Sequence, residues 1–188
     1  MAAATAIACA IASASPARAS TESISDQIVE TAPDRAFDMF LDRLMATESA
    51  GRSDAKNPRS SALGPFQFIR STFLDIARRY LPTEISGLSE EEVLELRRNR
   101  ELSRRAAAAF CRESAEFLKG EGVRPTFAHL RLAFLLGPAD AARVIQAQDR
   151  TPVRDLLSPA VIKANPFMRG MSVGDLLAKS ERDLSVRG

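Results

Sequence analysis

The sequence contains few of the residues that bind metals or form disulfides. Its 188 residues include two cysteines, Cys9 and Cys111, one histidine, His129, and no tryptophan. Zinc sites in proteins use three or four ligands, most of them Cys or His, so we expect no metal site and no cofactor. Local motifs for a Ser-His-Asp or Cys-His relay are also lacking.

The sequence also lacks a surplus of charge and a long apolar run. Its 26 Lys and Arg against 24 Asp and Glu give a formal net charge of +2. Binding to a phosphate backbone needs clustered positive charge, so nucleic acid is not an expected partner. No stretch reaches the roughly 18 apolar residues that a membrane span requires. The length and a hydrophobic content of 45% fit one domain with a single core, which we expect to be a monomer.

The first 19 residues follow the pattern of a secretory signal peptide. They are rich in alanine, and Ala17 and Ala19 fit the small-x-small pattern of a signal-peptidase site. We therefore expect cleavage after Ala19, export to the periplasm, a linker over residues 20–33 and a domain over residues 34–188. Because no Lys or Arg precedes the apolar run, a plain alanine-rich tail is the alternative.

The two cysteines have different expected roles. Cys9 does not fit a lipoprotein site, because Ala6 stands where a branched apolar residue is needed. Removal of the leader leaves only Cys111, so no internal disulfide is expected. Apolar residues surround Cys111 at helical spacing, which predicts a buried thiol that packs as a small apolar side chain and is not a nucleophile.

Helical patterns cover nearly the whole domain, which predicts a mainly α fold. Apolar residues at 37, 40, 41, 44 and 45 share one helical face, and Gly51 is placed to end this helix. Capping signals and apolar spacing predict further helices: 71–80, one from Ser89, 101–119, 126–136, 139–147, and two short ones from Ser158 and Ser172. The best place for a short extended piece is Phe66 to Ile69.

Arginines cluster between these helical segments. They stand at positions 97, 98, 100, 104 and 105, with glutamates at neighbouring helical positions. Such interleaving predicts a solvated face of mixed charge and not an anion-binding patch. The run from Leu132 to Leu136 is predicted to be the most buried helix of the core.

Glu48 continues the apolar face of the first helix, where a surface glutamate is not expected. Burial and the negative end of the helix both disfavour the charged carboxylate and raise its pKa. A carboxyl group with a raised pKa can act as a general acid. The alternative is a glutamate in a frayed last turn that turns its side chain to solvent.

The residues around Glu48 form an ordered set of motifs. The pair Glu48-Ser49 is followed by the segment from Gly64 to Phe68, with the sequence Gly-Pro-Phe-Gln-Phe, and later by Leu136-Gly137-Pro138. Over roughly residues 34 to 180 this set resembles the lytic transglycosylase branch of the lysozyme-like superfamily. The resemblance implies a lysozyme-like helical domain that cleaves the MurNAc to GlcNAc β-1,4 bond of peptidoglycan. It implies a lyase with a single catalytic glutamate and 1,6-anhydro-muramyl products.

The resemblance also implies roles for individual residues. Glu48 would be the catalytic acid and base, and Asp54, the next candidate carboxylate, is expected to be a solvated turn residue. The residues implied to surround the glutamate or contact the sugar are Ser49, Ser61, Gly64, Phe66, Gln67 and Phe134. Among these, Gly64 would let the backbone approach the glycan, Gln67 would hold a sugar hydroxyl or acetamido group, and Phe66 would contact a sugar face or the core.

The sequence departs from the family pattern in one helix. The family branch it most resembles tends to carry Tyr and His where this chain has Arg131 and Phe134, and Pro65 stands where Leu is common. Loss of one preorganised donor can lower a rate on the order of 100-fold. A second hypothesis is therefore a glycan-binding scaffold, weak or inactive as an enzyme, within an envelope-spanning assembly. A third is a hydrolysing muramidase.

Overall fold

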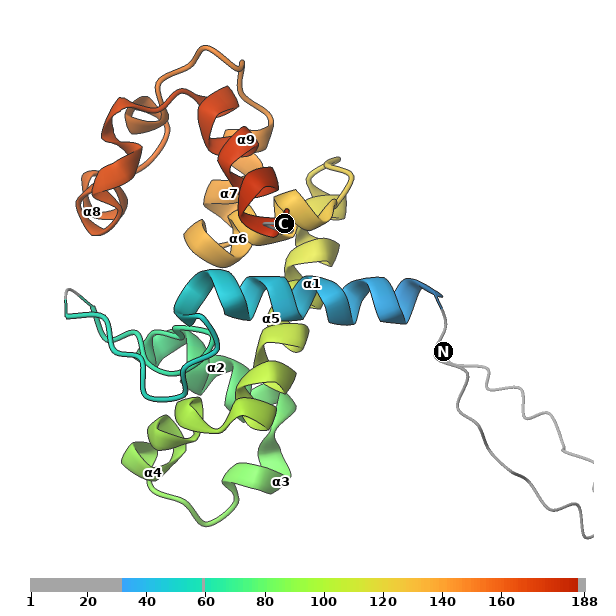
Figure 1. The fold of residues 1–188 in the computed structure, drawn as a ribbon, viewed down its shortest axis with the longest axis vertical. Helices are drawn as coiled ribbons and strands as arrows, with labels where there is room; N and C mark the ends of the chain where they lie inside the picture. The colour runs from blue at the N-terminus through green and yellow to red at the C-terminus, as the bar shows by residue number, and fades with distance from the viewer. Residues whose placement is uncertain (1–31, 59, 186–188) are drawn as a thin grey trace, which may run out of the picture. The chain divides into compact units, whose positions relative to one another are not determined.

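A computed structural model of the protein describes residues 32–58 and 60–185. The expected signal peptide and nearly all of the expected linker lie outside the described residues. The described part is mainly helical, which confirms the predicted fold class. Its α-helices are α1 (Ala32–Ser49), α2 (Arg70–Tyr80), α3 (Pro82–Ile85), α4 (Glu90–Glu95), α5 (Arg100–Gly120), α6 (Phe127–Leu136), α7 (Pro138–Ile145), α8 (Pro159–Ala164) and α9 (Val173–Leu184) (Figure 1).

Three short 3-10 helices and three isolated bridges complete the described secondary structure. The 3-10 helices are η1 (Leu96–Arg98), η2 (Val153–Asp155) and η3 (Pro166–Gly170). The bridges pair Leu63 with both Lys56 and Phe68, and Pro152 with Ser172. The predicted extended piece at residues 66–69 is thus reduced to a single bridge at Phe68, because the segment folds back on itself as a tight loop.

Two helix starts carry the predicted capping-box serines, and two more are capped by residues beside the predicted starts. Ser89 and Ser172 each form a reciprocal capping box with the acidic residue three positions on. The side chain of Asn99 caps α5, and the hydroxyl of Thr126 caps α6. These starts were predictable because the cap and the amide that it accepts lie within three residues of each other.

The structure differs from the prediction around α2. This helix begins at Arg70, one residue before the predicted start, with Ile69 at its N-cap. It ends at Tyr80 as predicted, but Pro82 then opens the further short helix α3, because proline is well tolerated in the first helical turn. Each residue before these starts has a backbone conformation outside the helical region.

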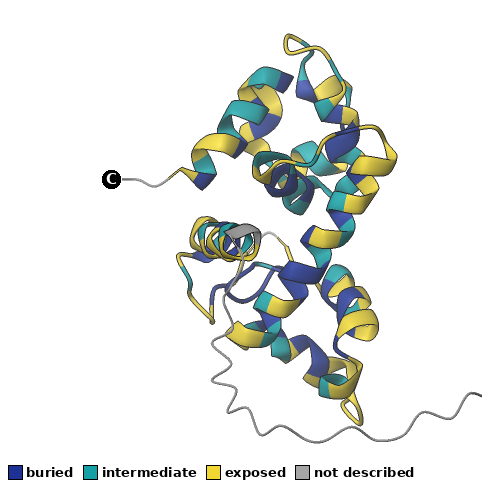
Figure 2. Cartoon of the chain, turned by 90° about the vertical axis from the view of Figure 1, so that its right-hand side faces the viewer, coloured by how far each residue is buried: buried dark blue, intermediate teal, exposed yellow. Residues whose placement is uncertain are grey.

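The buried side chains form two clusters that meet at α6. The first contains Phe40, Leu41 and Leu44 of α1 together with residues of the loop after α1 and of α2 and α5. The second contains Leu132 and Ala133 of α6 and residues of α7, η2, η3 and α9. Helix α6 packs against α5, α7 and α9, and exposed residues cover the outer sides of the helices (Figure 2). Of the run at residues 132–136, predicted to be the most buried helix of the core, Leu132 and Ala133 have no exposed surface, but residues 134–136 are partly exposed.

The arginine cluster is exposed or partly exposed except for one member. Arg98, Arg104 and Arg105 form ion pairs with acidic side chains, as expected for a solvated mixed face. Arg97 is buried and corrects this prediction. Its Nε donates to Leu94 O at 2.7 Å, and its Nη1 donates to the carbonyl oxygens of Ser61 at 2.7 Å and Phe68 at 3.2 Å. Arg97 therefore fastens the loop at residues 60–68 to the end of α4.

Candidate active site around Glu48

Glu48 lies in the last turn of α1 and faces the interior. Its side chain is 17% exposed, and it shares the helix face of the buried residues Leu41 and Leu44. The carboxyl group is thus not in a frayed turn. The sequence predicted this orientation because an inward face repeats every three or four residues along a helix.

The closest charged partner of Glu48 is Arg131 on α6. Nη1 of Arg131 lies 3.1 Å from Oε1 of Glu48, and the Arg131 side chain is 7% exposed. Arg131 also donates from Nη2 to Oδ2 of Asp183 at 3.3 Å. Lys179 contacts both carboxylate oxygens of Asp183, at 2.7 and 2.9 Å. We call these four residues, Glu48, Arg131, Lys179 and Asp183, the Glu48 cluster.

The surroundings of Glu48 shift the balance between the protonated and the ionised form of its carboxyl group. Burial is the largest influence and raises its pKa; Arg131 and Lys179 lower the pKa, and Asp183 raises it. The net direction is upward. Although an arginine lies close by, the site therefore favours the protonated acid more than water does, as a general acid requires.

Sequence reasoning identified only part of this cluster. Arg131 was noted as a departure from the family pattern, and Asp183 and Lys179 were not noted at all. The local signal on α9 is a Lys–Asp pair four residues apart, which is common on solvated helices. Nothing in the sequence indicated that this pair meets Arg131, 52 positions earlier than Asp183.

Ser49 connects Glu48 to the loop that follows α1. Its buried hydroxyl donates to Pro65 O at 2.7 Å, and its own carbonyl oxygen accepts from Arg52 Nε at 3.1 Å. The hydroxyl is therefore engaged with the protein backbone. Its geometric effect is to hold the Gly64–Phe68 segment next to the end of α1.

Gly64 is needed for a close approach between two parts of this protein. Its φ is +83°, and a Cβ atom built on it would lie 1.9 Å from the carbonyl oxygen of Arg97. Its amide donates to Ala55 O at 2.9 Å. The expected close approach to glycan is thus replaced here by a close approach to the backbone of Arg97.

Gln67 also uses its side chain within the loop. Its Nε2 donates to Gly64 O at 2.8 Å and to Ala55 O at 3.0 Å. Its backbone is in the left-handed region, with φ of +52°, which is uncommon for residues other than glycine. The two hydrogen bonds hold this conformation, so the amide nitrogen serves loop structure in the described state.

The other expected contact residues lie in different environments. Phe66 has no exposed surface and packs in the core, and Ser61 is exposed, with its Oγ accepting from Arg70 N at 3.2 Å. Phe134 is half-buried, and its ring packs edge to face against Phe68 and Phe110, with ring centroids 5.4 and 5.6 Å apart. The structure thus brings Glu48, Ser49 and the Gly64–Gln67 turn together and leaves Phe66 unable to contact a ligand.

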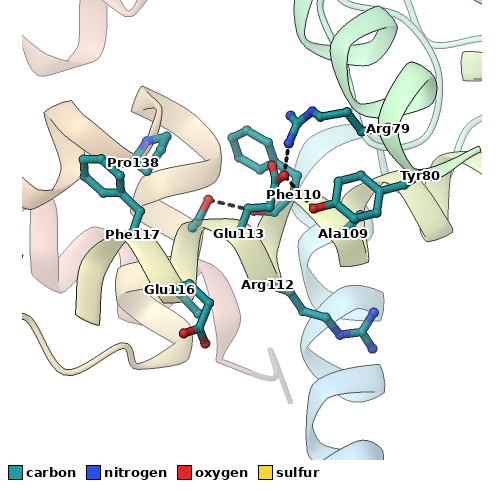
Figure 3. Close-up of a pocket in the computed structure, with 11 residues that line it drawn as sticks. Arg79, Tyr80, Ala109, Phe110, Arg112, Glu113, Glu116, Phe117 and Pro138 are labelled. Carbon is teal, nitrogen blue, oxygen red and sulfur yellow. Dashed lines mark hydrogen bonds and ion pairs between the residues drawn. The ribbon is translucent and has the colours of Figure 1, made fainter. Parts of the chain in front are cut away.

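A hollow of about 680 Å³ lies elsewhere, on the surface of α5. Figure 3 shows the rings of Tyr80, Phe110 and Phe117 around it, with Arg79 paired to Glu113 at the rim. Glu48 does not line this hollow. Asp54 is an exposed turn residue, as predicted.

Cys111 is buried and unpaired, and burial raises the pKa of its thiol to about 12. This agrees with the prediction that it packs as an apolar residue. Within the described ranges, no group of three or more His, Cys, Asp or Glu side chains could hold a metal ion. None of the helices in residues 32–58 and 60–185 is long and apolar enough to cross a membrane.

We predict that Gly64→Ala destabilises the protein far more than Gly87→Ala. Both glycines have positive φ, but a Cβ at Gly87 meets nothing within 4 Å. Gly87→Ala should therefore cost only the left-handed strain of about 1–2 kcal/mol, and the loss of unfolded-state entropy is the same for both changes. Gly64→Ala must also displace the Arg97 backbone. Chemical denaturation measures both free energies of unfolding, and equal losses would contradict the close approach.

We predict that Glu48→Gln alters how stability depends on pH. The folded-state pKa of Glu48 is raised, so its contribution is fully present below the unfolded pKa and is lost as pH rises through the folded pKa. Glu48→Gln should match the wild type in acid and become relatively more stable as pH rises. Denaturation at several pH values measures the difference, with the exposed Glu121→Gln as control. A wild type that gains stability over Glu48→Gln with rising pH would show that Arg131 outweighs burial.

Comparisons were made with models of known protein families and with curated proteins, and neither gave a match to this chain.

Proposed function

We propose that this protein is a peptidoglycan lytic transglycosylase in which Glu48 is the only catalytic acid and base. The observation that carries the proposal is a buried carboxyl with a raised pKa at the end of α1, placed beside the Gly64–Phe68 segment through the Ser49 to Pro65 hydrogen bond. These are also the residues on which the sequence resemblance depends. The substrate would be the glycan strands of peptidoglycan.

The chemistry needs one carboxyl group because the substrate supplies the nucleophile. Glu48 would donate its proton to the glycosidic oxygen as the bond from the MurNAc C1 to that oxygen breaks. The 6-hydroxyl oxygen of the same MurNAc would then bond to C1, and its proton would return to the Glu48 carboxylate. No water is consumed, and the product carries a 1,6-anhydro ring.

The other carboxylates near the site support this reaction over hydrolysis. Glycoside hydrolysis ordinarily uses two carboxyl groups, one on each side of the bond. Asp183 contacts Arg131 and Lys179, which hold it in a structural role. Asp54 lies in an exposed turn. Neither side chain is placed as the second catalytic carboxylate, so a hydrolysing muramidase is a weaker proposal.

A specific observation favours a second candidate function, a glycan-binding scaffold with little or no turnover. Arg131 stands where the related branch tends to carry Tyr, and its guanidinium lies 3.1 Å from Glu48. An arginine so close favours the carboxylate over the acid. In addition, the side-chain nitrogen of Gln67 already donates hydrogen bonds to two loop carbonyls and not to a sugar. Such a protein would hold peptidoglycan strands within an envelope-spanning assembly, and export by residues 1–19 belongs to either proposal.

We predict that Glu48→Gln abolishes the release of anhydro-muramyl products while the fold survives. Glutamine keeps the shape but cannot deliver a proton, and general acid–base assistance contributes roughly 100 to 10,000-fold. The measurement is mass spectrometry of peptidoglycan digested with wild type, Glu48→Gln and the exposed control Glu121→Gln. Circular dichroism of each variant checks the fold.

Each result assigns a function. Anhydro-muramyl ends from the wild type and from Glu121→Gln, with none from Glu48→Gln, support the transglycosylase. Reducing muramyl ends would indicate a hydrolase. Peptidoglycan binding without products from any of the three proteins would leave the scaffold. Equal product release by Glu48→Gln would remove Glu48 from the catalytic role.

A further inference from the structure

Arg131 has buried N–H groups that no acceptor satisfies. Its side chain is 7% exposed, and within residues 32–58 and 60–185 only Nη2 makes a hydrogen bond, to Asp183 at 3.3 Å. Nε and Nη1 are buried and have no hydrogen-bond partner among the described residues. Buried donors are almost always paired in folded proteins, so two unpaired nitrogens beside a carboxyl group need an explanation.

The carboxyl group of Glu48 lies within ion-pair distance of one of these donors. Its Oε1 lies 3.1 Å from Nη1, close enough for an ion pair, yet Nη1 is not aligned for a hydrogen bond. Arginine donors have a fixed planar geometry, so their alignment with one carboxylate depends on how the guanidinium is turned. Among the described residues, the hydrogen bond of this guanidinium goes to Asp183 and not to Glu48.

Asp183 is itself held from two sides. Lys179 contacts its carboxylate at 2.7 and 2.9 Å. Its backbone oxygen accepts from Thr47 Oγ1 at 2.9 Å, which fastens the end of α9 to the residue before Glu48. Asp183 is therefore a fixed acceptor, and the guanidinium of Arg131 is shared between this fixed acceptor and Glu48.

The charged groups around Glu48 come from several elements. Arg131 belongs to α6, and Lys179 and Asp183 belong to α9. Arg52, in the loop after α1, donates to Ser49 O. The side chain of Arg100 of α5 lies beside Gly51. Arg104, also of α5, pairs with Asp38 and Asp42 of α1. Of these groups, Arg131, Asp183 and Lys179 act on the ionisation of Glu48.

We propose that Asp183 is a positioning residue that holds the Arg131 guanidinium toward itself while Glu48 is protonated, and that Arg131 turns its free N–H groups to Glu48 when the proton leaves. This inference rests on the proposed function, in which Glu48 gives up and regains one proton in each cycle. With Glu48 protonated, two cations face one anion in the Glu48 cluster. With Glu48 ionised, the charges balance.

The arrangement would serve both halves of the reaction. A carboxylate formed in a buried site without a counter-ion is strongly disfavoured, and the free donors of Arg131 would stabilise it. An arginine that bound Glu48 alone would stabilise the ionised carboxylate so strongly that Glu48 could not act as a proton donor. Competition from Asp183 limits this stabilisation, and the negative charge of Asp183 also raises the pKa of Glu48 directly.

The test is a carbon-13 NMR titration of the Glu48 side-chain carboxyl in the full chain, with Glu48→Gln used to assign the resonance. Asp183→Asn keeps an acceptor for Arg131 and removes the charge, so the Glu48 midpoint should move to lower pH. Arg131→Met should move it to higher pH. Asp155→Asn, on the exposed turn η2, removes the same charge and should leave the midpoint unchanged.

The double variant Arg131→Met with Asp183→Asn separates positioning from direct repulsion. If Asp183 acts through Arg131, the downward shift caused by Asp183→Asn must shrink when Arg131 is absent, since coupled residues give non-additive effects. An equal shift in both backgrounds, or no shift with Asp183→Asn, would overturn the proposal. If Arg131→Met does not fold, Asp183→Asn is repeated with Arg131→Lys, which keeps the charge without the planar fork.

The pH profile of product release separates this inference from the proposed function. If the wild type cleaves peptidoglycan, the basic limb of its activity should move in the direction of the NMR midpoint in each variant. A wild type without activity would reject the proposed enzyme, while the NMR titration would still decide whether Asp183 positions Arg131. If the wild type is active but Asp183→Asn leaves the titration midpoint of Glu48 unchanged, the inference is rejected and the proposed function stands.

Discussion

The burial of the Glu48 carboxyl next to Arg131 and Asp183 is the constraint on which the site depends. Removing charged groups from water costs several kcal/mol for each ion unless partners compensate. The partners here come from three helices, with Glu48 on α1, Arg131 on α6 and Asp183 on α9. These helices must therefore meet at one point.

That loop is held by its own residues to an extent that the family resemblance did not imply. Ser49 binds the Pro65 carbonyl, Gln67 binds two loop carbonyls, and Gly64 makes room for the backbone of Arg97. Arg97 in turn binds the Ser61 and Phe68 carbonyls. The polar residues of the motif thus form hydrogen bonds that hold the loop after Glu48 in one conformation. A catalytic site needs its backbone held in place in this way, and a binding surface would be served equally well.

The sequence predicted what depends on near neighbours and missed what depends on distant ones. The inward face of Glu48 and the capping boxes at Ser89 and Ser172 each involve residues within one or two helical turns. The burial of Arg97 and the contact between Arg131 and Asp183 join segments 29 to 52 positions apart, so no local pattern carries them. Gly64 was singled out for an approach to glycan, and the need for glycine that the structure shows comes from the Arg97 backbone, which only the fold brings close.

The central claim is that Glu48, Arg131 and Asp183 form one buried unit in which Arg131 is shared between two carboxyl groups. An atomic-resolution crystal structure at acid and at alkaline pH tests it most directly. At acid pH the account predicts unequal C–O bond lengths in Glu48, the mark of a protonated carboxyl, with Arg131 hydrogen-bonded to Asp183. At alkaline pH it predicts equal bond lengths and an Arg131 N–H aligned with Glu48. A Glu48 side chain turned to solvent, or an Arg131 with the same hydrogen bonds at both pH values, would contradict it.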